Sequence, residues 1–194
     1  MANSNVIYAV TEKLRDILID SFQEDADLKQ LVSVGDIVFE NPGEADDKEA
    51  TKLSLWLYQV TENEHLKNQN EEYRPGNRLQ KPPLALNLYY LVTPFGKDIQ
   101  TNQLLMGRTL QTFHDNANVT LIDPDKEVAE KLHIVFCRLS LEELTRIWEA
   151  LREAYRLSVC YQVRVVQIDS QRMDTTARVT QRSGKFGPVP ELDT

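Results

Sequence analysis

Two stretches decide the fold: LSLWLYQV at residues 53–60 and LALNLYYLV at residues 84–92. In both, large apolar side chains recur at every second position, which is the period of a β-strand. Between residues 53 and 60 the alternate positions also hold Trp56 and Tyr58. The pattern therefore predicts two strands, with both faces of the first one covered.

The flanking segments predict helices as well as strands. Residues 98 onward form an expected helix, and the capping-box pattern Ser140-Leu141-Glu142-Glu143 opens another. Further strands are expected at 34–39, 119–122 (an edge strand), 132–139 and 157–168, and residues 41–49 read as a solvated turn. Residues with helical spacing are Ile7, Val10, Leu14, Ile17 and Leu18 near the start, Leu104, Leu105, Leu110 and Phe113 after residue 98, and Leu144, Ile147, Trp148 and Leu151 after the capping box.

This order of elements predicts an α+β fold: one domain over residues 1–169, with a mixed, mostly antiparallel sheet covered by helices. The long polar connection at 61–83 is typical of a functional loop. Residues 170–194 read as an extended C-terminal arm, weakly strand-like at 175–182. Such an arm can add a strand to a neighbour's sheet, and a disordered tail is the alternative.

Composition excludes several classes of protein. The chain has 194 residues and a net charge of −8, so a general nucleic-acid partner is not expected. No apolar run is long enough to span a membrane, and the polar start does not resemble a signal peptide. The two cysteines, Cys137 and Cys160, fall in apolar strands, which favours buried free thiols in a reducing compartment over a disulfide framework.

The charge is unevenly distributed along the chain. Residues 1–72 carry a net −10, whereas residues 73–194 carry a net +2. The basic side chains of the arm are Arg172, Arg178, Arg182 and Lys185. Either this distribution is ordinary solvated surface, or unlike surfaces of neighbouring subunits associate.

The sequence contains no pattern typical of catalysis. His65, His114 and His133 are isolated and lack metal-ligand spacing, and no glycine-rich phosphate loop or G-x-S-x-G motif occurs. Neither cysteine has a neighbouring histidine in the sequence. We therefore expect no enzymatic activity, no metal and no cofactor.

Six segments resemble the cap, or tail-terminator, proteins of contractile injection systems of the antifeeding-prophage and Photorhabdus-virulence-cassette type. They are residues 53–63, 81–94, 104–108, 113–116, 140–151 and 155–164. The resemblance extends over about residues 5–168. This chain has Ala117 where the family often has proline, and the arm varies among such proteins.

The resemblance implies a fold similar to phage tail-terminator proteins and a hexameric ring at the end of the particle away from the baseplate. This ring ends growth of the inner tube and holds the last sheath ring extended. The implied partners are further copies of the chain, the inner tube protein and the sheath protein. The particle is expected to assemble in the cytoplasm and to be released, or anchored to a host membrane through other components.

Within this scheme the loop and the arm are the expected contact segments. Ring or tube contacts are assigned to Asn63, Asn68, Arg74 and Arg78, and contacts to the sheath or a neighbouring subunit to Arg172, Arg178, Arg182 and Lys185. One alternative function is that of a phage tail-completion or neck protein. An alternative of a different class is a small-molecule-binding module or an enzyme of unknown type.

Overall fold

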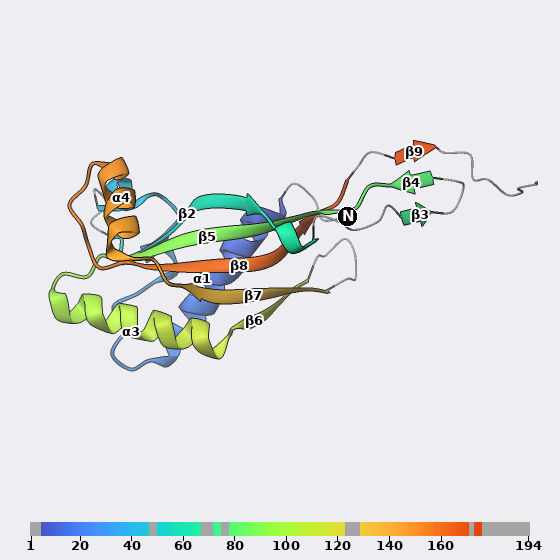
Figure 1. Ribbon diagram of the computed structural model, residues 1–194. Helices are drawn as coiled ribbons and strands as arrows, with labels where there is room; N and C mark the ends of the chain where they lie inside the picture. The colour runs from blue at the N-terminus through green and yellow to red at the C-terminus, as the bar shows by residue number, and fades with distance from the viewer. Residues whose placement is uncertain are drawn as a thin grey trace, which may run out of the picture. The chain divides into compact units, whose positions relative to one another are not determined.

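The two decisive stretches form antiparallel neighbours, β2 (Leu53–Glu62) and β5 (Leu84–Pro94), in a computed structural model (Figure 1). The structure describes residues 5–46, 50–66, 72–74, 78–122, 129–170 and 173–175. Each strand runs two residues further than the alternation predicted. A shift in register at Tyr58 marks a β-bulge in β2, and bulges increase the local twist of a strand.

Six strands make the main sheet, in the order β1-β2-β5-β8-β7-β6. β1 pairs parallel with β2, and the other pairings are antiparallel. The sheet is completed by β1 (Ile37–Val38), β6 (Asn118–Ile122), β7 (Ala129–Cys137) and β8 (Val159–Ile168). The predicted α+β class, the mostly antiparallel sheet and the edge position of residues 119–122 are therefore confirmed.

One face of the sheet packs against α1 (Val6–Glu24) and α3 (Ile99–Asp115), and the core lies between them. Val10 and Leu18 of α1 and Leu88 of β5 are completely buried. The core also contains a buried side-chain hydrogen bond, in which the Tyr90 and Thr11 hydroxyls lie 2.8 Å apart. This bond fixes α1 over the centre of β5.

The third long helix, α4 (Leu141–Leu151), lies at the end of the sheet where β8 begins (Figure 1). Its capping box is confirmed: Ser140 Oγ accepts the Glu143 N–H at 3.2 Å, and Glu143 accepts the Ser140 N–H at 2.8 Å. Trp148 is 2% exposed, and its Nε1 donates to Ser158 Oγ at 3.2 Å. It is the fully buried member of the stripe predicted for this helix.

Several local predictions were wrong. In place of a strand at 34–39 there is a 3-10 turn, Val34–Asp36, followed by the two residues of β1. Part of the expected turn at 41–49 is a short helix, α2 (Pro42–Asp46), which buries Pro42 and Ala45. Leu104, predicted to face inward, is 37% exposed because it lies on the same face of α3 as the exposed residues Gln100 and Gly107, whereas Leu105 faces the core.

The expected cover over both faces of residues 53–60 exists only in the first half. Leu53, Ser54 and Leu55 are buried, but burial decreases along β2 and Val60 is 44% exposed. On the face opposite the core, Trp56 and Tyr58 are half-buried and pack with their ring centroids 6.0 Å apart. We call this the outer face of the main sheet.

Residues Asn70–Pro82 and Ser170–Thr194 form a second compact unit. It contains a three-stranded antiparallel sheet of β3 (Glu72–Arg74), β4 (Arg78–Gln80) and β9 (Met173–Thr175), with β4 in the middle. The stretch 61–83, expected to be a loop, thus contains strands, and part of it groups with the arm. Residues 176–182, expected to be weakly strand-like, lie outside the described residues.

Candidate assembly surfaces

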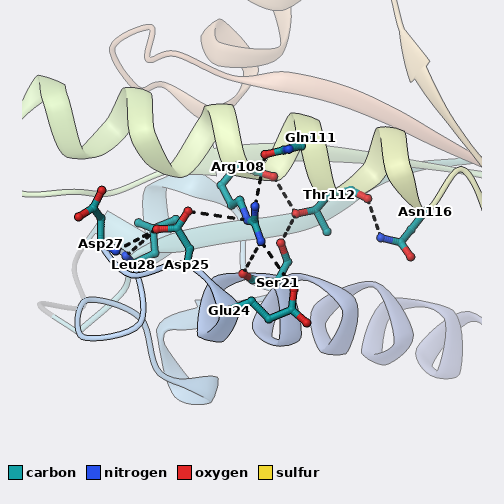
Figure 2. A network of polar contacts seen from close by, with 9 residues as sticks. All are labelled: Ser21, Glu24, Asp25, Asp27, Leu28, Arg108, Gln111, Thr112 and Asn116. Atoms are coloured by element: carbon teal, nitrogen blue, oxygen red, sulfur yellow. Dashed lines mark hydrogen bonds and ion pairs between the residues drawn. The ribbon is translucent and has the colours of Figure 1, made fainter.

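α3 is held against the C-terminal end of α1 by a polar seam (Figure 2). Arg108 Nη2 donates to the Ser21 carbonyl at 3.0 Å, and the Thr112 and Ser21 hydroxyls are hydrogen-bonded at 2.6 Å. Glu24 and Asp25 lie 3.8 and 4.0 Å from the guanidinium group. Because the Glu24 side chain is 79% exposed, its ion pair contributes little. The shortest contacts of the seam between α1 and α3 are therefore the hydrogen bonds to Ser21.

Two edges of the main sheet are open in the part of the chain that the structure describes. β1 pairs only with Leu53 and Ser54, so β2 has no strand partner on that side from Leu55 to Thr61. On the opposite side of the sheet, β6 pairs with β7 alone among the described strands. The β6 sequence, NVTLI, includes no charge or proline, the residues that commonly protect an edge strand from further pairing.

The two open edge strands, β2 and β6, run in the same direction. Four successive antiparallel pairings separate β2 from β6, so these strands run the same way. An edge of one copy can therefore meet the opposite edge of a second copy in the same orientation. Such a head-to-tail contact is heterologous, and a heterologous contact generates a ring when its rotation closes.

The outer face holds an open hollow of about 540 Å³. Its lining consists of Asn63, His65, Leu66, Asn87, His133, Val135, Gln162 and Arg164. Arg164 Nε donates to Gln162 Oε1 at 2.8 Å, and Gln162 Nε2 donates to Tyr89 Oη at 2.9 Å. His133 Nδ1 lies 2.6 Å from Asn118 Oδ1. Hydrogen bonds thus hold the side chains of His133, Gln162 and Arg164 in place, which suits a structured polar contact surface.

Asn63 lies in a turn directly after β2, and it is 7% exposed. Its N–H donates to the Ala85 carbonyl at 2.8 Å and its Oδ1 accepts the His65 N–H at 3.1 Å. Its Nδ2 donates to Asn87 Oδ1 at 3.3 Å. The structure thus gives Asn63 a role in shaping the turn, and its predicted use in ring or tube contacts stays a prediction.

The other predicted contact residues fall in or near the second unit. The backbones of Arg74 and Arg78 pair directly across the β3–β4 hairpin. Asn68 lies outside the described residues, and so do the arm residues Arg172, Arg178, Arg182 and Lys185. The structure brings Arg74 and Arg78 together and leaves the contact role of all these residues a prediction.

Sequence reasoning missed the seam at Arg108 and the open edge of β2. The seam joins residues that are far apart in the chain, and no local pattern marks it. The β2 edge depends on the order of strands in the sheet, which the alternation along a single strand does not reveal.

Neither a metal site nor a membrane helix is found where the structure can be described. Within the described ranges, no group of three or more His, Cys, Asp or Glu side chains is placed to hold a metal ion. Among the helices of those ranges, none has the length and apolar character needed to cross a membrane.

Comparison with known proteins adds a family and a fold. The family model described as "Pvc16 N-terminal domain" matches residues 9–182. No curated protein matches the chain. Among solved structures, the chain is similar to the sheath/tube terminator, in its extended state, of an extracellular contractile injection system named PVC: the TM-score is 0.66 at 20% identity, over 96% of this chain and 65% of that one.

A second similar structure is the tube-terminating cap of the anti-feeding prophage, with a TM-score of 0.51 at 22% identity, over 76% of this chain and 53% of that one. The chain thus spans between half and two thirds of the length of these two proteins. At such identities the likeness establishes the fold, which is the one expected for a terminator protein.

Proposed function

The chain belongs to the Pvc16 N-terminal domain family, and on that premise we propose that it is a structural cap that terminates the inner tube of a contractile injection system. The observation that carries the proposal is the combined match in family and fold, since one similar structure is a sheath/tube terminator and another is a tube-terminating cap. The proposed position is the end of the tube distal to the baseplate. There the cap ends tube growth and holds the last sheath ring extended.

The proposed assembly is a ring of six copies. Support comes from the open β2 and β6 edges, which lie at opposite sides of one sheet and run in the same direction. Backbone hydrogen bonding between β6 of one copy and β2 of the next supplies a repeated heterologous contact. The net −10 of residues 1–72 and the net +2 of the remaining chain also favour contacts between unlike surfaces.

The proposed partners beyond the ring are the inner tube protein and the sheath protein. The β3–β4 hairpin with Arg74 and Arg78 is assigned to ring or tube contacts, and the basic arm to the sheath or to a neighbouring subunit. The role is structural, with no enzymatic step, no nucleic acid and no direct membrane insertion. The particle that carries the cap assembles in the cytoplasm before release or anchoring.

The proposal is tested by assembling particles with and without the chain. With it, we expect tubes of uniform length and extended sheaths, measured by negative-stain microscopy. Without it, we expect tubes of variable length and contracted or loose sheaths. Unchanged tube lengths and sheaths in its absence would refute the cap function. Attachment of a phage head to the end that the chain occupies would favour the neck protein instead.

The ring contact has its own variant. Thr120 is an exposed residue of β6, and Thr120→Asp places a charge on the open edge. We expect this change to reduce ring formation on tubes and to lengthen the tubes. Gln103→Asp, at an exposed position of α3, is the matched control for the added charge and leaves length unchanged. Equal behaviour of the two variants would remove β6 from the ring contact.

A further inference from the structure

The two cysteines of the chain are direct neighbours in the main sheet. Cys137 of β7 and Cys160 of β8 are paired opposite one another in the antiparallel register. Opposed residues of such a pair have Cα atoms about 4.5 or 5.5 Å apart and project from the same face. Both separations lie within the range that a disulfide bridges. No other cysteine exists in the chain to compete as an intramolecular partner.

The surroundings give the two thiols different roles. Cys160 is 2% exposed and its Sγ lies 3.2 Å from the Tyr58 hydroxyl. Cys137 is half-exposed, so a small oxidant in solution reaches its sulfur first. Hydrogen bonding to Cys160 lowers the pKa of Cys137, while the same contact and burial raise the pKa of Cys160. Cys137 is therefore the attacking thiol and Cys160 the resolving one.

We infer that Cys137 and Cys160 form a cross-strand disulfide when the protein meets a disulfide oxidant such as oxidised glutathione. The Cys137 thiolate attacks one sulfur of the oxidant, giving a mixed disulfide and releasing one glutathione. The Cys160 sulfur then attacks Cys137 Sγ and releases the second glutathione. Together the two cysteines lose two electrons and two protons. These electrons and protons are taken up by the two glutathione molecules, which leave as thiols.

The bond has a structural consequence. It joins β7 to β8 and closes the chain segment that contains α4, so α4 becomes part of a covalent loop. Closing a loop of about 24 residues reduces the freedom of the unfolded chain, which raises the melting temperature of a protein of this size by roughly 5–10 °C. The disulfide thus stabilises the folded chain outside reducing conditions.

The test uses the full chain, folded under reducing conditions and then transferred to oxidised glutathione. We expect peptide mapping to show a Cys137–Cys160 bond with loss of two hydrogen atoms in mass, blocked alkylation of both thiols, and the rise in melting temperature, which dithiothreitol reverses. Cys137→Ser and Cys160→Ser serve as matched controls, and neither shows the rise. The mass readout on the wild-type chain does not depend on either variant.

Two results overturn the inference. One is that both thiols remain open to alkylation after native incubation with the oxidant. The other is that the oxidised product is a stable glutathione adduct or a bond between two chains. Either result would show that the pair cannot reach disulfide geometry within the folded sheet.

Discussion

The hydrogen bond between Thr11 and Tyr90 offers a sharp test of how α1 is fixed to the sheet. The two hydroxyls are 2.8 Å apart, Tyr90 is completely buried and Thr11 is 6% exposed. Thr11 Oγ1 also donates to the Ile7 carbonyl at 3.0 Å, so the shared proton of the pair comes from Tyr90. Thr11→Val keeps the shape of the side chain and leaves the Tyr90 hydroxyl buried without this acceptor.

The expected magnitudes follow from this arrangement. Thr11→Val costs about 2 kcal/mol of unfolding free energy, because it leaves the buried Tyr90 hydroxyl without a hydrogen-bond acceptor. Tyr90→Phe costs about 1 kcal/mol, since Thr11 keeps its bond to Ile7. The double variant leaves no buried polar group without a partner, and it costs about 1 kcal/mol as well. The coupling energy of the cycle is therefore about 2 kcal/mol.

Urea unfolding followed by circular dichroism measures these differences, and Thr11→Val shifts the midpoint by about 1 M. Thr109→Val is the matched control: Thr109 is completely buried in α3, and its hydroxyl donates to the Leu105 carbonyl one turn back. We expect a cost below about 0.5 kcal/mol there. If the cost of the double variant equals the sum of the two single costs, the buried bond does not fix α1 and the reasoning fails.

Three further predictions concern other parts of the fold. Ser140→Ala removes the cap of α4 and lowers the unfolding free energy by about 1 kcal/mol in the same urea assay, whereas Ser140→Thr restores it. Burial raises the pKa of Tyr90 from 10 to about 12, so its contribution to stability is complete below pH 10 and is lost as the pH rises through about 12. Melting curves should show a loss of about 2–3 kcal/mol in unfolding free energy over that pH range. The Tyr90→Phe variant should not show this loss. Arg108→Met removes the bond to the Ser21 carbonyl and should speed amide hydrogen exchange at the end of α1, and unchanged exchange there would contradict the seam.

The local patterns predicted the elements well where large apolar residues recur with the period of a strand or a helix. The alternation at 53–60 and 84–92 identified β2 and β5, and the capping box located the start of α4 within one residue. The prediction at 34–39 failed because a short apolar stretch can form either a turn or a strand. Residues 41–49 failed because Pro42 starts a helix as readily as it ends a strand.

The candidate surfaces were harder to predict because they depend on which strands become neighbours. The sequence pattern predicted that Cys137 and Cys160 lie in apolar strands. Only the β7–β8 register shows that they are opposite one another. The same is true of the open edges, since the place of β2 and β6 in the sheet order is a long-range property. For Asn63, the polar loop suggested a side chain available for contacts with a partner. In the structure both polar atoms of this side chain are used in hydrogen bonds within the chain.

The most direct test of the central claim is electron cryomicroscopy of the tube end in particles that contain this chain, with an affinity label on one terminus to identify it. We expect a six-fold ring of labelled copies seated on the last tube ring, at the end distal to the baseplate, in contact with the last sheath ring. Labelled density at the baseplate, along the tube wall or absent from the particle would contradict it.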